Sequence, residues 1–379
     1  MIKKRLFTPG PTEVPHAVLL EMARPTIHHR KSEFAEIFKE VIANLNRIFL
    51  STGEIFVLSA SGTGAMEAAV QNFTCEGDRA LTIDSGKFGE RWTSLCKKAG
   101  VEAEVLSYEW GKAALPSDIE KKLAADSSIK AVFTTLVETS TGTLHPIEEI
   151  AKVVSKTDAV LVVDAVSALG SDRIKVDQWG VDVVVSGSQK ALMTPPGIAL
   201  MCVNKKARSV YEKNTRNTYY WNLKSASKSL SKGQTPYTPA VNMLMGLLEA
   251  LRMINREVIE NVWARHEQLA EAARAGIKAM GLELYSESPA NGLTAVKIPD
   301  PDRIGSAFVK HLEERHGIYF AGGQDQVKGK IFRIAHMGYY DKMDVIIALA
   351  SVEMTLKELG VGDVLGKGVK AAMEVFSAR

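Results

Sequence analysis

The sequence is poor in the features that would assign it to a secreted, disulfide-bonded or membrane class. It contains only three cysteines, at positions 75, 96 and 202, which are too few and too unevenly spaced for a disulfide framework or a thiolate metal site. No apolar run approaches the roughly 18 residues of a membrane span. The basic start at Met1 to Arg5 is followed by Thr8-Pro9-Gly10-Pro11, where a signal peptide would need its apolar stretch. We therefore expect a cytoplasmic protein without a metal site.

The sequence also has no marked excess of charge of either sign. Lys and Arg number 47 against 44 Asp and Glu, so the net charge is only +3, and the basic residues are scattered along the chain. Such a balance disfavours nucleic acid and anionic membranes as partners. A chain of 379 residues that is 46% hydrophobic can bury a large core and divide into two domains. Small molecules are the expected ligands.

Residues 54 to 203 alternate short β-branched runs with longer amphipathic stretches, which is typical of a parallel sheet covered by crossover helices. The pattern predicts an α/β fold whose large domain holds a mainly parallel, seven-stranded sheet. The expected strands are Glu54–Leu58, Arg79–Asp84, Val101–Tyr108, Lys130–Val137, Ala159–Asp164, Asp182–Ser186 and Ile198–Val203.

The pattern changes after about Asn255 and predicts a smaller α+β domain. The expected elements are a helix at Val258–Met280, a strand at Leu293–Ile298, a helix at Asp302–Arg315, short strands around Tyr319 and Phe332, and a helix from Lys342. We expect residues 1–20 to form an N-terminal segment at the active-site mouth, 21–255 the large domain and 256–379 the small domain. The polar, aromatic segment Asn214–Thr238 is expected to be a loop that reaches a site or a partner subunit.

Three segments of the large domain carry chemistry. Val183 to Lys190 is an apolar strand that delivers a lysine at its end, where open α/β sheets place their ligands. The preceding strand ends in the carboxylate of Asp164, and parallel strands would bring both groups to the same sheet edge. Ser61-Gly62-Thr63 opens a helix after a strand, where free N–H groups and the helix dipole favour an anion. Judged alone, Lys190 would be an ordinary loop lysine, and only its companions favour a catalytic role.

These segments, in this order and with the opening Thr8-Pro9-Gly10-Pro11-Thr12, resemble the class V aminotransferases of pyridoxal phosphate (PLP) fold type I. The resemblance is strongest to the alanine–glyoxylate, serine–glyoxylate and serine–pyruvate aminotransferases. It runs from Phe7 to about Gly360, and its most specific part is the stretch from Ser186 to Leu192.

The resemblance implies a role for each matching residue. Lys190 would hold PLP as a Schiff base and carry the proton during catalysis, and Asp164 would bind the pyridine nitrogen. The implied phosphate contacts are Ser61, Gly62, Thr63 and Gln189. Phe88 would stack on the ring, Val166 would pack beneath it, and Thr139 would lie near the ring oxygen. Arg333 would bind the substrate carboxylate, with Gly10 also at the substrate.

The segment Gln234 to Thr238 resembles a loop that the neighbouring subunit lends to the phosphate. Whether Tyr237, Thr238 or Gln234 makes the contact stays open, because the spacing departs from the Tyr-x-x-Thr pattern of relatives. If any of them does, each active site needs two chains and the protein is a homodimer.

The implied reaction is ping-pong transamination, in which alanine or serine gives its amino group and glyoxylate or pyruvate accepts it. Three alternatives remain: a 2-aminoethylphosphonate aminotransferase, a cysteine desulfurase-like lyase, and a PLP-binding or regulatory subunit without turnover. The lyase would need a cysteine on a flexible loop near the substrate, and none of the three cysteines is so placed in the sequence.

Overall fold

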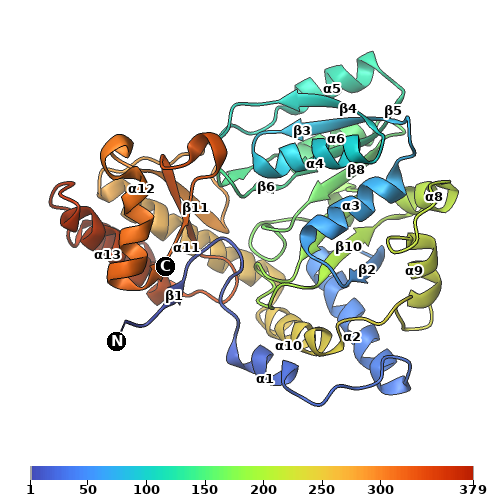
Figure 1. The fold of residues 1–379 in the computed structure, drawn as a ribbon, viewed down its shortest axis with the longest axis horizontal. Coiled ribbons are helices and arrows are strands. Elements are labelled where there is room, and N and C mark those ends of the chain that lie inside the picture. Colours follow the sequence, from blue (N-terminus) through green and yellow to red (C-terminus); the bar gives the residue numbers. More distant parts are fainter. Residues whose placement is uncertain (1, 379) are drawn as a thin grey trace.

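The fold is taken from a computed structural model that describes residues 2–378. Met1 and Arg379, the outer ends of the expected segments 1–20 and 256–379, lie outside the described residues. A large sheet with most of the helices forms one part of the molecule, and the C-terminal helices with a small sheet form the other (Figure 1). The domain boundaries that we expect at residues 20 and 255 stay predictions.

The large sheet contains all seven expected strands, each within two residues of its predicted ends. In spatial order they are β2 (Glu54–Leu58), β10 (Ala199–Val203), β9 (Val183–Gly187), β8 (Val160–Asp164), β5 (Ile129–Thr135), β3 (Arg79–Asp84) and β4 (Glu102–Ser107). Strand β10 is antiparallel to both neighbours, and the other pairs are parallel. The prediction of a mainly parallel sheet is confirmed.

Helices cover both faces of this sheet, which is why its central strands are apolar at nearly every position. Alternate residues of β8 illustrate this: Leu161 and Val163 join one core, whereas Val160 and Val162 join the other. The first core is covered by α2 (Ser32–Phe49), α5 (Pro116–Ala125), α6 (Ile147–Val154) and α10 (Val241–Glu257). The second is covered by α3 (Gly62–Phe73), α4 (Lys87–Lys98), α8 (Lys205–Lys213) and α9 (Leu223–Leu230).

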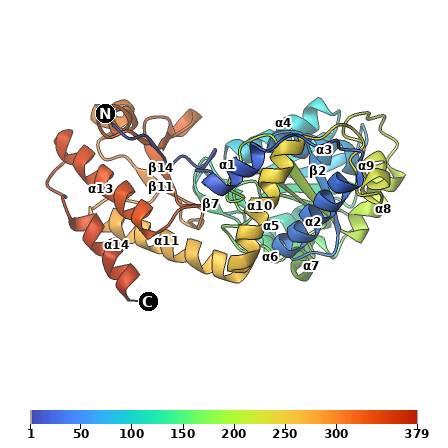
Figure 2. The ribbon, with the colours of Figure 1, turned by 90° about the horizontal axis from the view of Figure 1, so that it is seen from below.

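The C-terminal part is built on a three-stranded antiparallel sheet with helices packed on it. Its strands are β11 (Leu293–Lys297), β14 (Ile331–Ala335) and β13 (Ala321–Gly322). Its helices are α11 (Ile259–Ala279), α12 (Pro301–His311), α13 (Lys342–Glu358) and α14 (Lys367–Ser377). Figure 2 shows α11 running from the end of α10 out to the C-terminal helices, with α13 above it in this view and α14 crossing it.

The N-terminal segment crosses to the C-terminal part. Strand β1 (Arg5–Leu6) pairs in parallel with β12 (Ile318–Tyr319). Phe7 is buried there and stacks on Tyr340 with ring centroids 5.4 Å apart. Residues 8–15 then lead back to α1 (His16–Met22) beside α10. The two ends of the chain therefore contribute to one hydrophobic core.

Two expectations need correction. The segment expected as the loop Asn214–Thr238 contains helix α9, because Asn222 accepts a hydrogen bond from Ser225 N at 2.8 Å and Leu223 is buried against the sheet. The helix expected at Asp302–Arg315 is α-helical only to His311 and continues as a π-turn, Leu312–His316.

No helix within residues 2–378 combines the length and the apolarity needed to span a membrane.

Phe7→Ala should weaken the packing of the N-terminal segment on the C-terminal part. Because the ring is 2% exposed, we expect the free energy of unfolding in urea to fall by roughly 3–5 kcal/mol. The matched control is Ile2→Ala, since Ile2 lies in the same segment but is 54% exposed and should change stability by less than about 0.5 kcal/mol. Equal losses in both variants would contradict the burial argument.

Candidate active site

Six strands of the large sheet run in one direction and end at the same edge, and five of them lead to the expected site residues. β3, β5, β8 and β9 are parallel, and β2 has the same direction because it and β9 are both antiparallel to β10. Eight of the expected site residues follow directly from these strand ends: Ser61, Gly62, Thr63, Phe88, Thr139, Val166, Gln189 and Lys190. Asp164 is the last residue of β8. Parallel topology thus gathers groups from distant parts of the sequence.

Lys190 is 8% exposed, and the N-terminal segment closes over it. Its Nζ donates a hydrogen bond to Pro9 O. The Thr12 hydroxyl donates to Lys190 O at 2.9 Å. Gly10 has a φ of +131°, and a Cβ at this position would lie 2.6 Å from Lys190 Cδ, so only glycine fits. The structure therefore brings the expected residue Gly10 into contact with the lysine.

The burial of Lys190 sets the proton affinity of its amine. Loss of hydration lowers the pKa of Lys190 to about 8; the Asp164 carboxylate opposes this effect, and the Arg333 and Arg91 cations add to it. Burial likewise raises the pKa of Asp164 to about 6, against the hydrogen bond that Val166 N donates to its Oδ1 at 2.7 Å. Near neutral pH the amine is therefore much easier to deprotonate than an exposed lysine.

The turn before α3 presents an anion site. Ser61 is the N-cap residue, yet its hydroxyl makes no capping hydrogen bond. Val166 packs directly on Gly62, and a Cβ at position 62 would lie only 2.7 Å from Val166 Cγ2. Thr63 Oγ1 accepts a hydrogen bond from Arg91 Nη1 at 3.0 Å. N–H groups, a free hydroxyl and a guanidinium thus converge at the start of a twelve-residue helix.

Arg91 is a site residue that the sequence interpretation missed. Its guanidinium lies over one face of the Phe88 ring, 4.6 Å from the centroid, and leaves a single face for stacking. The three-residue spacing of Phe88 and Arg91 in helix α4 puts them on one side, and that signal was available in the sequence.

Glu138 is a second residue that was missed. It is fully buried, and its Oε2 accepts hydrogen bonds from Phe88 N and Gly89 N, both at 3.0 Å. Its Oε1 accepts from Ser140 N and Ser140 Oγ. Burial raises the pKa of Glu138. This carboxylate fixes the start of α4 and hence Phe88, and because its partners lie about fifty positions earlier, no local spacing could reveal it.

Arg333 reaches the site from β14. Its Nη1 donates to Thr139 O at 2.9 Å, and Nη2 and Nε donate to Gly322 O at 2.7 and 3.2 Å. Thr139 in turn donates from Oγ1 to Ser167 Oγ at 2.6 Å. Burial lowers the pKa of Arg333 to about 10. Within residues 2–378, the Arg333 guanidinium donates hydrogen bonds to carbonyls and forms no ion pair, and the buried Glu138 carboxylate acts on it only through its electric field, so the guanidinium can still bind an anion.

The segment Gln234–Thr238 lies apart from Lys190 within its own chain. Arg30 donates to Gln234 Oε1 at 3.0 Å, and Tyr237 Oη donates to Tyr219 O at 2.6 Å. Thr238, which is exposed, has His29 Nε2 3.5 Å from its hydroxyl. The structure gives no contact between this segment and the lysine of the same chain among the described residues.

The arrangement fits pyridoxal phosphate. Lys190 offers a buried amine, Asp164 a buried carboxylate for a ring nitrogen, and the Ser61 turn a place for a phosphate. Gln189 adds an independent sign, because its Oε1 is buried without a hydrogen-bond partner, and turning the amide would aim its NH₂ donors at an anion. An unpaired buried amide costs free energy unless a ligand satisfies it.

Comparison with known proteins agrees with this chemistry. A family model described as "Aminotransferase class-V" matches residues 6–342. An uncharacterized aminotransferase of Methanocaldococcus jannaschii is 42% identical over 99% of this chain and 98% of its own. The soluble hydrogenase 42 kDa subunit of Anabaena cylindrica is 40% identical over 99% of each chain. A serine–glyoxylate aminotransferase of Methylorubrum extorquens is 37% identical over 98% and 95%.

The fold comparison gives the same result. The crystal structure of ureidoglycine–glyoxylate aminotransferase from Bacillus subtilis superposes with a TM-score of 0.95 at 30% identity, covering 100% of this chain and 99% of that one. The family match spans most of the chain, and both the seven-stranded sheet and the lysine at its edge are in place. The chain therefore belongs to the class-V aminotransferase family and is a PLP-dependent transaminase.

Proposed function

We propose that this enzyme transfers the amino group of alanine or serine to glyoxylate or pyruvate in two half-reactions at one site. The observation that carries the proposal is Arg333, a buried guanidinium near Lys190 that forms no ion pair with any of residues 2–378. A planar α-carboxylate is the ligand that such a fork binds best.

Substrates with one carboxylate are favoured, because Arg333 is, within residues 2–378, the one arginine near Lys190 that remains available to bind a carboxylate. Arg91, the other arginine that acts on Lys190, is already bonded to Thr63 and stacked on Phe88 at the anion turn. A dicarboxylate would need a second cation of this kind. The glyoxylate named for the Methylorubrum and Bacillus proteins supports the same substrate class for this chain.

In this proposal each residue of the site has a task toward the cofactor. Lys190 would hold it covalently, Asp164 would bind its ring nitrogen, and Val166 and Phe88 would pack against its ring. Ser61, Gly62, Thr63 and Gln189 would bind its phosphate, and the Thr139 hydroxyl would serve its ring oxygen. When bound, PLP supplies an electron-withdrawing ring that stabilises negative charge at the α-carbon of the amino acid.

Lys190 also moves the proton in the proposed mechanism. An amine with a pKa of about 8 can accept a proton and return it near neutral pH, which an exposed lysine does poorly. Arg333 orients the amino acid through its carboxylate, Gly10 leaves room above the lysine, and the N-terminal segment at Pro9 and Thr12 keeps water from the amine.

The cysteines argue against a desulfurase. Cys96 and Cys202 are fully buried, and burial raises the pKa of each thiol to about 12. Cys75 lies beyond the far end of α3, so the length of this twelve-residue helix, about 18 Å, separates it from Ser61. None of these thiols can reach a substrate at Lys190 as a thiolate nucleophile.

We also propose that the active enzyme is a homodimer in which Tyr237 or Thr238 of one chain completes the phosphate site of its partner. The segment contacts His29 and Tyr219 at the surface rather than its own lysine. Tyr219 and Tyr220 beside it are 82% and 48% exposed. Exposed aromatic groups of this kind are typical of surfaces that bind another protein.

Half-reactions provide the first test. The PLP-loaded protein is mixed with L-alanine, L-serine, L-aspartate or 2-aminoethylphosphonate. The cofactor absorbance is measured together with the carbonyl product, which is an oxo acid from the amino acids and an aldehyde from 2-aminoethylphosphonate. We expect one oxo acid per site from alanine or serine and reversal by glyoxylate or pyruvate. Lys190→Ala should abolish turnover and the exposed control Lys112→Ala should retain it. If only 2-aminoethylphosphonate gave a carbonyl product, the proposal of alanine or serine as the amino donor would be wrong.

Arg333→Gln tests carboxylate binding. Removing one partner of a buried charged hydrogen bond costs roughly 2–5 kcal/mol, so kcat/KM for the amino acid should fall accordingly, mainly through KM. The control is Arg303→Gln, because Arg303 is half exposed and paired with Asp300 at the surface. An unchanged KM in Arg333→Gln would remove the proposed role.

The pH dependence of Lys190 acetylation tests its electrostatic setting. In the apoprotein, trace labelling with acetic anhydride should show a midpoint near pH 8 for Lys190 and a higher one for Lys112, whose pKa its hydrogen bond to Glu109 raises. Arg333→Gln removes a cation and should raise the Lys190 midpoint, whereas Asp164→Asn removes an anion and should lower it. Shifts of the opposite sign would refute this assignment.

A further inference from the structure

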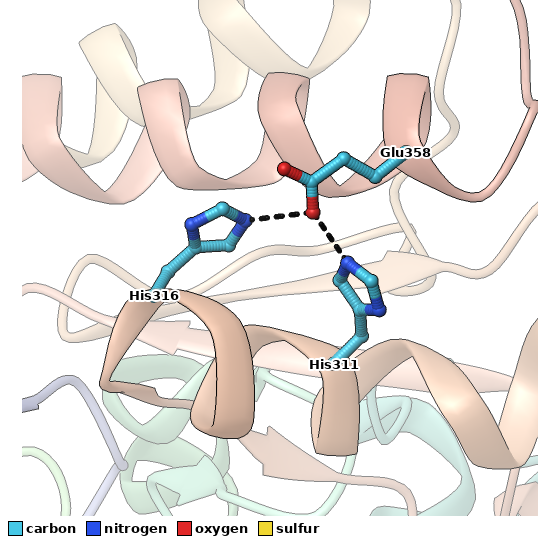
Figure 3. Close-up of side chains that lie close together, drawn as sticks. All are labelled: His311, His316 and Glu358. Carbon is cyan, nitrogen blue, oxygen red and sulfur yellow. Dashed lines mark hydrogen bonds and ion pairs between the residues drawn. The ribbon is translucent and has the colours of Figure 1, made fainter. Parts of the chain in front are cut away.

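A second cluster of chemically active side chains lies in the C-terminal part of the molecule. His311 ends α12, His316 ends the π-turn that follows, and Glu358 ends α13. Figure 3 shows both imidazole rings directed at the same carboxylate. One donor atom from each residue lies within 4.8 Å of the other two. No residue of this cluster belongs to the site around Lys190.

The π-turn is what brings the two histidines together. In an α-helix of 3.6 residues per turn, side chains five positions apart differ by about 140° in direction and cannot face one ligand. The i→i+5 hydrogen bonding of a π-turn winds the chain more widely and so brings residues five apart closer to one side. Residues Leu312–His316 form such a turn directly after α12. Because this spacing suits no α-helical metal site, a metal site was not predicted from the sequence.

The donor atoms are close to the spacing of a metal site. His311 Nε2 is 2.5 Å from Glu358 Oε2, and His316 Nε2 is 3.3 Å from the same oxygen. Ligands of tetrahedral zinc, each about 2.0–2.2 Å from the ion, lie roughly 3.4 Å apart. Small side-chain rotations would therefore admit an ion. The three side chains are 23%, 12% and 35% exposed, so solvent can reach the ion and supply a fourth ligand.

His316 carries an independent sign of a missing ligand. Its Nε2 is buried and makes no hydrogen bond, although the carboxylate oxygen is 3.3 Å away. A buried ring nitrogen that makes no hydrogen bond, with only a carboxylate contact 3.3 Å away, costs free energy. A metal ion bound between the three residues would accept the lone pair of His316 Nε2.

We propose that His311, His316 and Glu358 form a site for a divalent transition-metal ion, with zinc as the ion that two imidazoles and one carboxylate suit best. Bound there, the ion joins the end of α12 and its π-turn to the end of α13, and so stabilises the C-terminal part rather than taking part in transamination. Arg315 acts electrostatically on Glu358, and this nearby cation makes binding weaker than at an otherwise equal site without it.

Zinc binding by tag-free holoenzyme tests the proposal. After treatment with a chelator, the protein is dialysed against zinc chloride, and zinc per chain is measured together with the midpoint of thermal unfolding. Wild type should bind one zinc more per chain than His311→Ala/His316→Ala, and zinc should raise the midpoint only where it binds. Magnesium chloride should do neither, since Mg²⁺ prefers oxygen ligands.

Two further variants keep the test decisive. The control variant His28→Ala/His29→Ala removes two imidazoles that lie next to each other, with ring centroids 5.1 Å apart, outside the proposed site. This variant should still bind the zinc. Glu358→Gln preserves the size of the side chain and should weaken zinc binding at least tenfold even if the double variant folds poorly; transaminase activity reports that the fold is intact. Equal zinc binding by wild type and both cluster variants, or no zinc bound by wild type, would overturn the proposal.

Discussion

The loss of water around Lys190 is the constraint on which the rest of the site depends. Burial makes the ammonium form less favourable than in water and so lowers the pKa of Lys190. The neighbouring groups then adjust this pKa, which Asp164 raises and which Arg333 and Arg91 lower further. The amine is held in a desolvated place by a closely packed strand end on one side and by Pro9 to Thr12 on the other. Without that enclosure, the lysine would be an ordinary surface cation.

The enclosure depends on both ends of the chain. The N-terminal segment is anchored far from the lysine, where β1 pairs with β12 and Phe7 packs on Tyr340, before it returns over the sheet edge. Arg333 arrives from β14 of the same C-terminal part and bonds to Thr139 O of the large sheet's loops. The position of Arg333, the proposed carboxylate ligand, and the burial of Lys190 therefore both depend on the contacts between the two parts of the molecule.

The pattern of apolar residues predicted the seven strands of the large sheet and two of the three strands of the small sheet, β11 and β14; the strand expected around Tyr319 pairs with β1 instead. The polar residues at the strand ends predicted that Lys190, Asp164 and the Ser61 turn lie together, because parallel strands end at one edge of the sheet. Contacts that depend on tertiary packing could not be predicted in this way. Glu138 binds the start of α4 across fifty residues, and the π-turn that turns His316 toward Glu358 leaves no mark in the apolar pattern. The contact between Arg91 and Phe88 could have been predicted, because residues three apart in a helix lie on one face.

Borohydride reduction of the PLP-loaded protein, followed by peptide mapping, tests the central claim most directly, because reduction fixes the cofactor to the amine that holds it. The account predicts one phosphopyridoxyl group per chain, on the peptide that contains Lys190, and none on the many exposed lysines. Attachment mainly at another lysine, or no attachment to a protein that binds PLP, would contradict it.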